Sequence, residues 1–171
     1  MRSTLKFLVA LIAAFMVMLA FRALVFTIYT VEGADMAPLF RNGDRVMVNR
    51  WSYGLRTGGT GIFSYGRIAR QAVDRDDVIA VDDSLGHVLL CRCMAQPSDT
   101  VSMEGRTIIV PGTATCAHQD YYCVRPLGSN TKTMLLPEKY IIGRAFLIIY
   151  SHQKDKPFWT GYDTQRRLLP I

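Results

Sequence analysis

The sequence predicts a mainly β protein in which one N-terminal helix precedes a single antiparallel β domain. Two observations carry this prediction. The first thirty residues contain an almost unbroken apolar run, and beyond Tyr29 short apolar or β-branched runs alternate with turn residues without a helical period. With 171 residues, 50% of them hydrophobic and 20% charged, the chain is long enough for one domain with its own core and too apolar to be disordered.

Residues 7–29 form the predicted helix, which we interpret as a transmembrane anchor. The run FLVALIAAFMVMLAF is followed by Arg22, close enough to one end to reach the membrane interface. Arg2 and Lys6 precede the run, so the positive-inside rule places residues 1–6 in the cytoplasm. We therefore expect a single-pass protein of the inner (cytoplasmic) membrane, in contact with the lipid bilayer, whose residues 30–171 lie on the extracytoplasmic, periplasmic side.

Two alternatives for this helix are a cleaved signal peptide and a buried core helix. The first is disfavoured because neither Leu19-Ala20-Phe21 nor Val31-Glu32-Gly33 is a good small-x-small cleavage site. The second is disfavoured because the β-like sequence that follows offers no helical partner.

The β domain is predicted from short runs in residues 46–48, 78–81, 87–93 and 140–150, and from a hairpin in residues 101–110 that turns at Glu104-Gly105. The last run contains Gly143, which indicates a bulge or bend. Together these runs predict a coiled roll or barrel-like antiparallel sheet. The glycine-rich residues 58–66 lack the lysine and the following helix of a phosphate loop, so we interpret them as a flexible loop.

The charge pattern gives no indication of nucleic-acid binding. The net charge is +6, but Arg2, Lys6 and Arg22 contribute half of it and flank or interrupt the predicted anchor. The remaining residues mix both signs and have no strongly basic face. Nothing in the sequence indicates a cofactor.

The four cysteines fit an oxidising compartment. Cys116 and Cys123 flank a short loop and form the candidate disulfide. A zinc site with His118 is disfavoured because neither cysteine pair has the usual C-x2–4-C spacing, so we expect no metal. Cys91 and Cys93 share one face of a predicted strand, as two buried thiols or as a second disulfide.

The segment VEGADMAPLFRNGDRVMVNR, residues 31–50, resembles bacterial signal peptidase I, the serine–lysine leader peptidase. That family carries G-x-S-M-x-P followed by G-D-x-V-x-V. The stretch CRCMAQPSD, residues 91–99, is similar to the family's K-R-x-x-G-x-P-G-D, and the residues from Pro137 to Ala145 are similar to its closing segment. The resemblance implies a signal peptidase I type roll, with peptide-groove candidates Gly33, Met36, Pro38 and Arg92 and structural motif residues Gly43, Asp44, Pro97, Asp99 and Gly143.

The chain departs from the family at both reacting positions. Asp35 stands where the resemblance implies the serine nucleophile, and Cys91 stands where it implies the lysine base. There is no lysine between Lys6 and Lys132, so a small shift of the alignment does not restore the dyad. An arginine such as Arg92 does not replace the base because its guanidinium does not deprotonate.

We therefore hypothesise a catalytically degenerate homologue that binds signal peptides, preproteins or a secreted partner, as a scaffold or chaperone. One alternative is an active signal peptidase with an atypical site, in which Cys91 with His87, or Asp35 with a carboxylate such as Asp99, does the chemistry, or in which a partner completes the site. The other is a purely structural membrane protein without a peptide groove.

Overall fold

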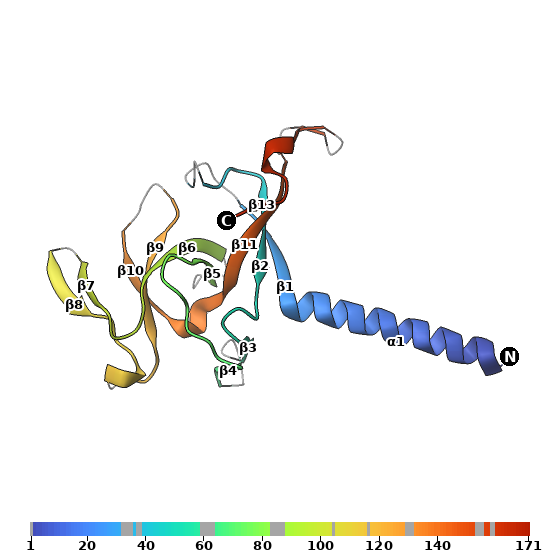
Figure 1. The fold of residues 1–171 in the computed structure, drawn as a ribbon, viewed down its shortest axis with the longest axis horizontal. Coiled ribbons are helices and arrows are strands. Elements are labelled where there is room, and N and C mark those ends of the chain that lie inside the picture. The colour runs from blue at the N-terminus through green and yellow to red at the C-terminus, as the bar shows by residue number, and fades with distance from the viewer. Residues whose placement is uncertain are drawn as a thin grey trace.

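The computed structural model describes residues 2–31, 36, 39–58, 64–82, 88–103, 105–115, 117–128, 132–152, 156–157 and 160–171, with only the backbone of residues 2, 3 and 20–24. Helix α1 spans Arg2–Val25 and projects away from the β domain (Figure 1). Residues 26–29, the end of the predicted anchor, instead begin strand β1, Phe26–Thr30.

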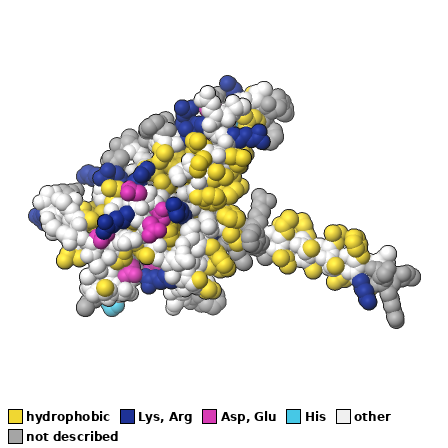
Figure 2. All heavy atoms as spheres, viewed as in Figure 1, with side chains coloured by type: hydrophobic (Ala, Val, Ile, Leu, Met, Phe, Trp, Pro, Cys, Tyr) yellow, Lys and Arg dark blue, Asp and Glu magenta, His cyan; other side chains and the backbone are white. Residues whose placement is uncertain are grey.

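The side chains of residues 4–19 of α1 are exposed around the whole helix. Phe7 is 71% exposed and Val17 is 69% exposed, and hydrophobic side chains gather along the helix in Figure 2. Among the described residues, no helix has both the length and the apolarity needed to cross a membrane.

Apart from three short 3-10 helices, the regular elements in the rest of the described chain are all β-strands. Its strands, in chain order, are β2 (Asp44–Asn49), β3 (Leu55–Thr57), β4 (Gly66–Ile68), β5 (Val78–Asp82), β6 (Val88–Ala95), β7 (Thr100–Met103), β8 (Arg106–Ile109), β9 (Tyr121–Pro126), β10 (Met134–Pro137), β11 (Ile141–His152), β12 (Tyr162–Asp163) and β13 (Leu169–Pro170). Three short 3-10 helices interrupt them: η1 (Thr113–Thr115), η2 (Glu138–Tyr140) and η3 (Thr164–Arg166). The prediction of a mainly β antiparallel fold behind one N-terminal helix is confirmed.

The main sheet has the strand order β1-β2-β11-β5-β6-β9-β10, with β12 and β13 also paired to β11. All of its pairs are antiparallel. Two small hairpins, β3-β4 and β7-β8, stand beside it, and the second is the hairpin predicted in residues 101–110.

Strand β11 lies between β2 and β5 and carries the predicted irregularity. Its register to β5 shifts between Ile141 and Gly143. A Cβ atom on Gly143 would lie 2.2 Å from the carbonyl oxygen of Asn49 in β2, so only glycine allows the two backbones to approach this closely.

Each face of the main sheet is covered by its own apolar cluster. The first face is formed by Val31, Phe40, Val46, Val48, Val78, Ala80, Leu90, Ile142, Ala145 and Ile148. The second face is formed by Tyr53, Val73, Ile79, Val81, Cys91, Cys93, Tyr122, Val124 and Ile141. Neighbouring residues of β5 and β6 alternate between the two clusters, as the twofold repeat of a strand requires.

The predicted disulfide between Cys116 and Cys123 is wrong. Cys123 is a free thiol, buried on β9 in a small cluster with Ala95 and Val110, so its side chain points into packed interior. Cys116 lies outside the described residues. Cys91 and Cys93 are also free and buried, which decides between the two alternatives left open for them.

Candidate functional site

The segment that resembles the nucleophile motif forms a loop between β1 and β2 that closes on itself. The amide of Val31 donates to the carbonyl of Asp44 at 2.8 Å, and the amide of Gly43 donates back to Val31 at 3.0 Å. Within the loop, the amide of Phe40 donates to the carbonyl of Met36 at 3.0 Å. Gly33, Asp35 and Pro38 lie outside the described residues, but Met36 packs against the first-face cluster, so the loop lies over the first face.

The G-D pair at the end of this loop is closely packed. Gly43 has φ of +92°, and a Cβ atom there would lie 2.0 Å from the carbonyl oxygen of His152. Asp44 is fully buried and accepts from the amide of Arg41 at 2.8 Å and from Arg166 at 2.6 Å. Both residues shape the loop.

Cys91, at the position of the lysine base, lies on β6 between Ile79 of β5 and Pro126 of β9. It is fully buried in the second-face cluster, whereas Leu90 before it belongs to the first-face cluster. Burial raises the pKa of the Cys91 thiol to about 12. Met36 and Cys91 therefore face opposite sides of the sheet, and Cys91 is neither a thiolate near neutral pH nor directed toward the loop.

Arg92 follows Cys91, and the alternation of the strand turns its side chain toward the first face. That side chain is 39% exposed, and its guanidinium lies 3.9 Å from Asp76. Arg92 and Met36 therefore lie on the same face of the sheet. Two residues that line one peptide groove must share a face in this way.

Asp99 stabilises the turn at the end of the second motif, residues 91–99. Its carboxylate accepts from the amide of Gln96 at 2.7 Å and from Arg75 at 2.7 Å, and the bond from Arg75 lowers the pKa of Asp99. Ser98, where the family motif has glycine, has φ of +72°. Pro97 lies in the same turn. The carboxylate of Asp99 is therefore engaged in this turn, and His87, the other candidate partner, lies outside the described residues.

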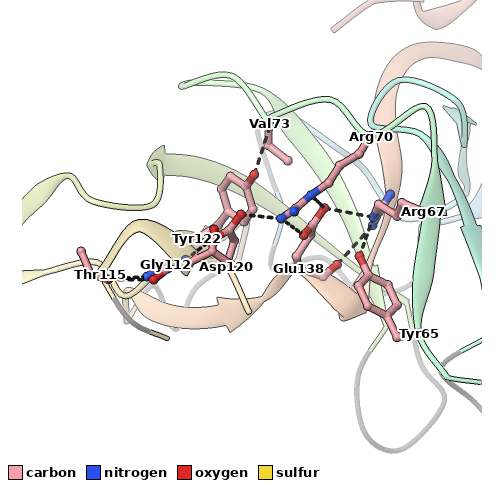
Figure 3. Close-up of polar contacts among 10 residues, drawn as sticks. Tyr65, Arg67, Arg70, Val73, Gly112, Thr115, Asp120, Tyr122 and Glu138 are labelled. Carbon is pink, nitrogen blue, oxygen red and sulfur yellow. Dashed lines mark hydrogen bonds and ion pairs between the residues drawn. The ribbon is translucent and has the colours of Figure 1, made fainter. Parts of the chain in front are cut away.

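A buried charge network that sequence reasoning missed lies at the corner between β10 and β11 (Figure 3). Glu138 contacts both Arg67 and Arg70, and Arg70 also bonds to Asp120. The guanidinium of Arg67 donates to the carbonyl of Gly54 at 3.0 Å and to those of Glu138 and Ile141. The network fastens the β3-β4 hairpin to the main sheet. No local sequence signal marks this network, because the partners of Glu138 are distant in sequence.

Strand β1, which leads into the motif loop, is an edge strand. Within the described residues its one strand partner is β2, so β1 lies at the edge of the described sheet. Such an edge accepts an extended peptide by strand addition. No group of three His, Cys, Asp or Glu side chains in the described part of the chain is placed to share a metal ion.

Comparison with known proteins adds one match. The family model described as "Signal peptidase, peptidase S26" matches residues 4–135, which include α1, the motif loop and β6. No curated protein matches the chain.

Proposed function

Because the chain belongs to the signal peptidase family, peptidase S26, we propose that it binds extended peptides without cleaving them. The bound peptides would be signal peptides of preproteins or segments of a secreted partner, and the protein would act as a scaffold or chaperone. In this proposal the antiparallel sheet is the roll-shaped peptide-binding domain of the signal peptidase I type.

One observation supports the proposed loss of peptidase activity. Cys91, at the position of the lysine base, is buried on the face of the sheet opposite to Met36, and burial raises its pKa to about 12. A serine–lysine hydrolase needs a desolvated neutral lysine beside its nucleophile. Removing the nucleophile or its base in a comparable hydrolase costs about a millionfold in rate.

Peptide binding is supported by what the chain retains. The edge of β1 offers a row of backbone donors and acceptors beside the motif loop. Arg92 and Met36 share the first face, over which the loop lies. Backbone hydrogen bonds to an edge strand supply affinity without any catalytic group.

We also propose that α1 holds the chain at a lipid bilayer, with residues 1–6 in the cytoplasm and the β domain outside it. The support is the ring of exposed apolar side chains on a helix that leaves the domain, with Arg2 and Lys6 at its start. Membrane fractions washed at alkaline pH should retain the chain, and protease added outside the cytoplasmic membrane should digest the β domain. Release into the wash, or a protected β domain, would contradict this arrangement.

The peptide-binding proposal is tested with the purified full chain in detergent. A fluorescent signal-peptide analogue should bind saturably, and a preprotein substrate should remain uncut. Cleavage that Asp35→Ala abolishes would instead establish an active peptidase with an atypical site. A chain that binds no analogue and co-purifies with no secreted protein would be a structural membrane protein.

A further inference from the structure

Among the described residues, the apolar cluster on the second face of the main sheet covers only part of that face. The cluster contains residues of β5, β6 and β9, reaches β11 only at Ile141, and includes no residue of β1 or β2. Arg144, which pairs with Ile79 of the cluster and bonds to Asp77 at 3.0 Å, marks the border. We call the second face of β1, β2 and residues 144–150 of β11 the open face.

An apolar row crosses the open face. Ile28 of β1 pairs with Met47 of β2, Met47 pairs with Leu147 of β11, and Leu147 pairs with Pro170 of β13. Directly paired residues point to the same face of a sheet, and Val48, the neighbour of Met47, is buried in the first-face cluster. The row therefore points to the open face.

The row is accessible although its members are apolar. Ile28 is 43% exposed, and Met47 and Leu147 are only partly buried. Beside the row, the ring centroids of Phe26 and Phe146 lie 5.9 Å apart. Figure 2 shows hydrophobic side chains gathered over this part of the domain. Contiguous exposed apolar surface of this kind marks sites of interaction with proteins or membranes.

The rim of the open face is polar and aromatic. One row further from α1, Thr30 pairs with Arg45, and Arg45 pairs with Tyr150. The guanidinium of Arg45 lies 5.4 Å from the centre of the Tyr150 ring. Arginine and tyrosine side chains have an apolar body and a polar tip, which suits them to the headgroup region of a bilayer. The rim therefore favours a lipid surface as the partner of this face.

The open face is also continuous with α1. The helix ends at Val25 and β1 begins at Phe26. The amide of Arg50, just after β2, donates to the carbonyl of Val25 at 2.9 Å and so ties the helix end to the sheet. Ile28 lies three residues beyond the helix, about 10 Å along the strand. Trp51, which is 54% exposed, follows Arg50 at the same junction. A bilayer around α1 would therefore reach the first strand of the open face.

We propose that the open face rests on the surface of the lipid bilayer that holds α1, with its apolar row at the boundary between acyl chains and headgroups. Contact with acyl chains removes the row from water, while Arg45 and Tyr150 keep their polar atoms among the headgroups. The inference rests on the proposed attachment of α1 to a bilayer and adds a second surface through which the domain meets the same membrane.

The first test locates single fluorescent labels relative to the lipid. The full chain is placed in nanodiscs of phosphatidylcholine and phosphatidylglycerol. Cys116 is replaced by serine in every variant, because the other three cysteines are buried and react poorly. One cysteine is then added by Leu147→Cys, Ile109→Cys or Val9→Cys and labelled with a fluorophore. Nitroxide-labelled phosphatidylcholine in the disc quenches labels that touch lipid.

The label at Leu147 should be quenched, and the label at Ile109 should not. Leu147 lies two strands from β1, about 10 Å from Ile28 across the sheet. Ile109 is the matched control because it is 60% exposed on β8, at the side of the domain away from α1 (Figure 1). Equal quenching at Leu147 and Ile109 would overturn the proposal.

The second test assigns the contact to the apolar row. Met47→Glu places a charge at the centre of the row, and a charge is costly to hold against acyl chains. The label at Leu147 should then lose most of its quenching, while the label at Val9 keeps its own. Ile109→Glu adds the same charge outside the open face and should change neither signal. Quenching at Leu147 that survives Met47→Glu would overturn the assignment, because the label would then be near lipid only through α1.

The outcomes separate the two proposals. If the label at Val9, which is 59% exposed on α1, is not quenched, the attachment of α1 fails and the inference fails with it. If Val9 is quenched and Leu147 is not, only the contact of the open face fails. A Leu147 label that lipid leaves unquenched but that is shielded in a dimer of the chain would make a second copy the occupant and overturn the inference. Peptide binding is unaffected by each of these results.

Discussion

The guanidinium of Arg166 lies 2.6 Å from the buried carboxylate of Asp44, across 122 residues of sequence. The same guanidinium donates to the carbonyl of Leu39 at 2.7 Å. Arg166 comes from η3, beyond residues 4–135 that match the signal peptidase family, while Asp44 and Leu39 close the motif loop. The C-terminal segment therefore fastens the loop that carries Asp35.

Replacing Arg166 with methionine should leave Asp44 as an unpaired buried charge. We expect the free energy of unfolding to fall by about 3 kcal/mol, the usual cost of removing one partner of a buried ion pair. Denaturant titration of the full chain in detergent measures this change. Arg167→Met at the exposed neighbouring position should change it by no more than about 0.5 kcal/mol. Equal effects of the two variants would mean that the Arg166–Asp44 pair does not stabilise the loop.

Gly43→Ala should destabilise the fold for two additive reasons. The new Cβ would collide with the carbonyl oxygen of His152, and the positive φ of +92° is strained for alanine. Gly105→Ala is the matched control, because Gly105 has φ of +78° but no atom within 4 Å of the added Cβ. The control should cost only about 1 kcal/mol for the backbone strain. Thermal unfolding of both variants should show a clearly larger loss for Gly43→Ala.

Rebuilding the dyad with Asp35→Ser and Cys91→Lys should not produce a peptidase. The lysine would enter the second-face cluster, away from the loop, where burial of its charge lowers its pKa by about 3–5 units. That shift corresponds to about 4–7 kcal/mol of lost stability. Met94→Lys, at an exposed position of the same strand, should be tolerated. Preprotein cleavage by the double variant would contradict the assignment of Cys91 to the second face.

The buried Cys91 thiol should make the fold sensitive to alkaline pH. Its folded-state pKa of about 12 lies above the ordinary value of 9.0. Between these values the unfolded chain has lost this proton while the folded chain keeps it, so stability falls as pH rises through this window. Cys91→Val should reduce the slope of the unfolding free energy there by up to about 1.4 kcal/mol per pH unit. Identical slopes in both proteins would refute a raised thiol pKa.

The free thiols provide a direct check of the cysteine assignments. Cys91, Cys93 and Cys123 are buried and free, so a thiol reagent at pH 8 should modify none of them in the folded chain. After unfolding without a reductant, mass spectrometry should find all three modified. Protection of Cys123 after unfolding would show that it is disulfide-bonded.

The strands could be predicted from the sequence where apolar and polar residues alternate or where a short apolar run ends in turn residues. The predicted anchor includes residues 26–29 of strand β1 because large apolar residues continue past the end of the helix as far as Tyr29. The loop positions of Gly43 and Asp44 follow from the motif, but the contact of Asp44 with Arg166 depends on pairing across the whole sheet. The Cys123 thiol was mispredicted because loop length alone does not determine which way a strand residue points.

The sequence likewise does not determine which face of the sheet the Cys91 side chain points to. The motif supplies its neighbours, but a one-residue change in strand register exchanges the two faces. Similarly, the network of Glu138, Arg67 and Arg70 joins distant segments: Glu138 lies 71 residues after Arg67 and 68 residues after Arg70. Such pairs carry no local signal.

The fastening of the motif loop by Arg166 has a consequence for the order in which the molecule assembles. The β1-β2 hairpin joins neighbouring segments and forms early, whereas contacts between distant segments form late because the loop-closure entropy must be overcome first. The contact between Arg166 and Asp44 spans 122 residues. A newly made chain would therefore complete its motif loop only after the sheet has assembled, and under the proposed function an unfinished molecule would not yet bind a peptide.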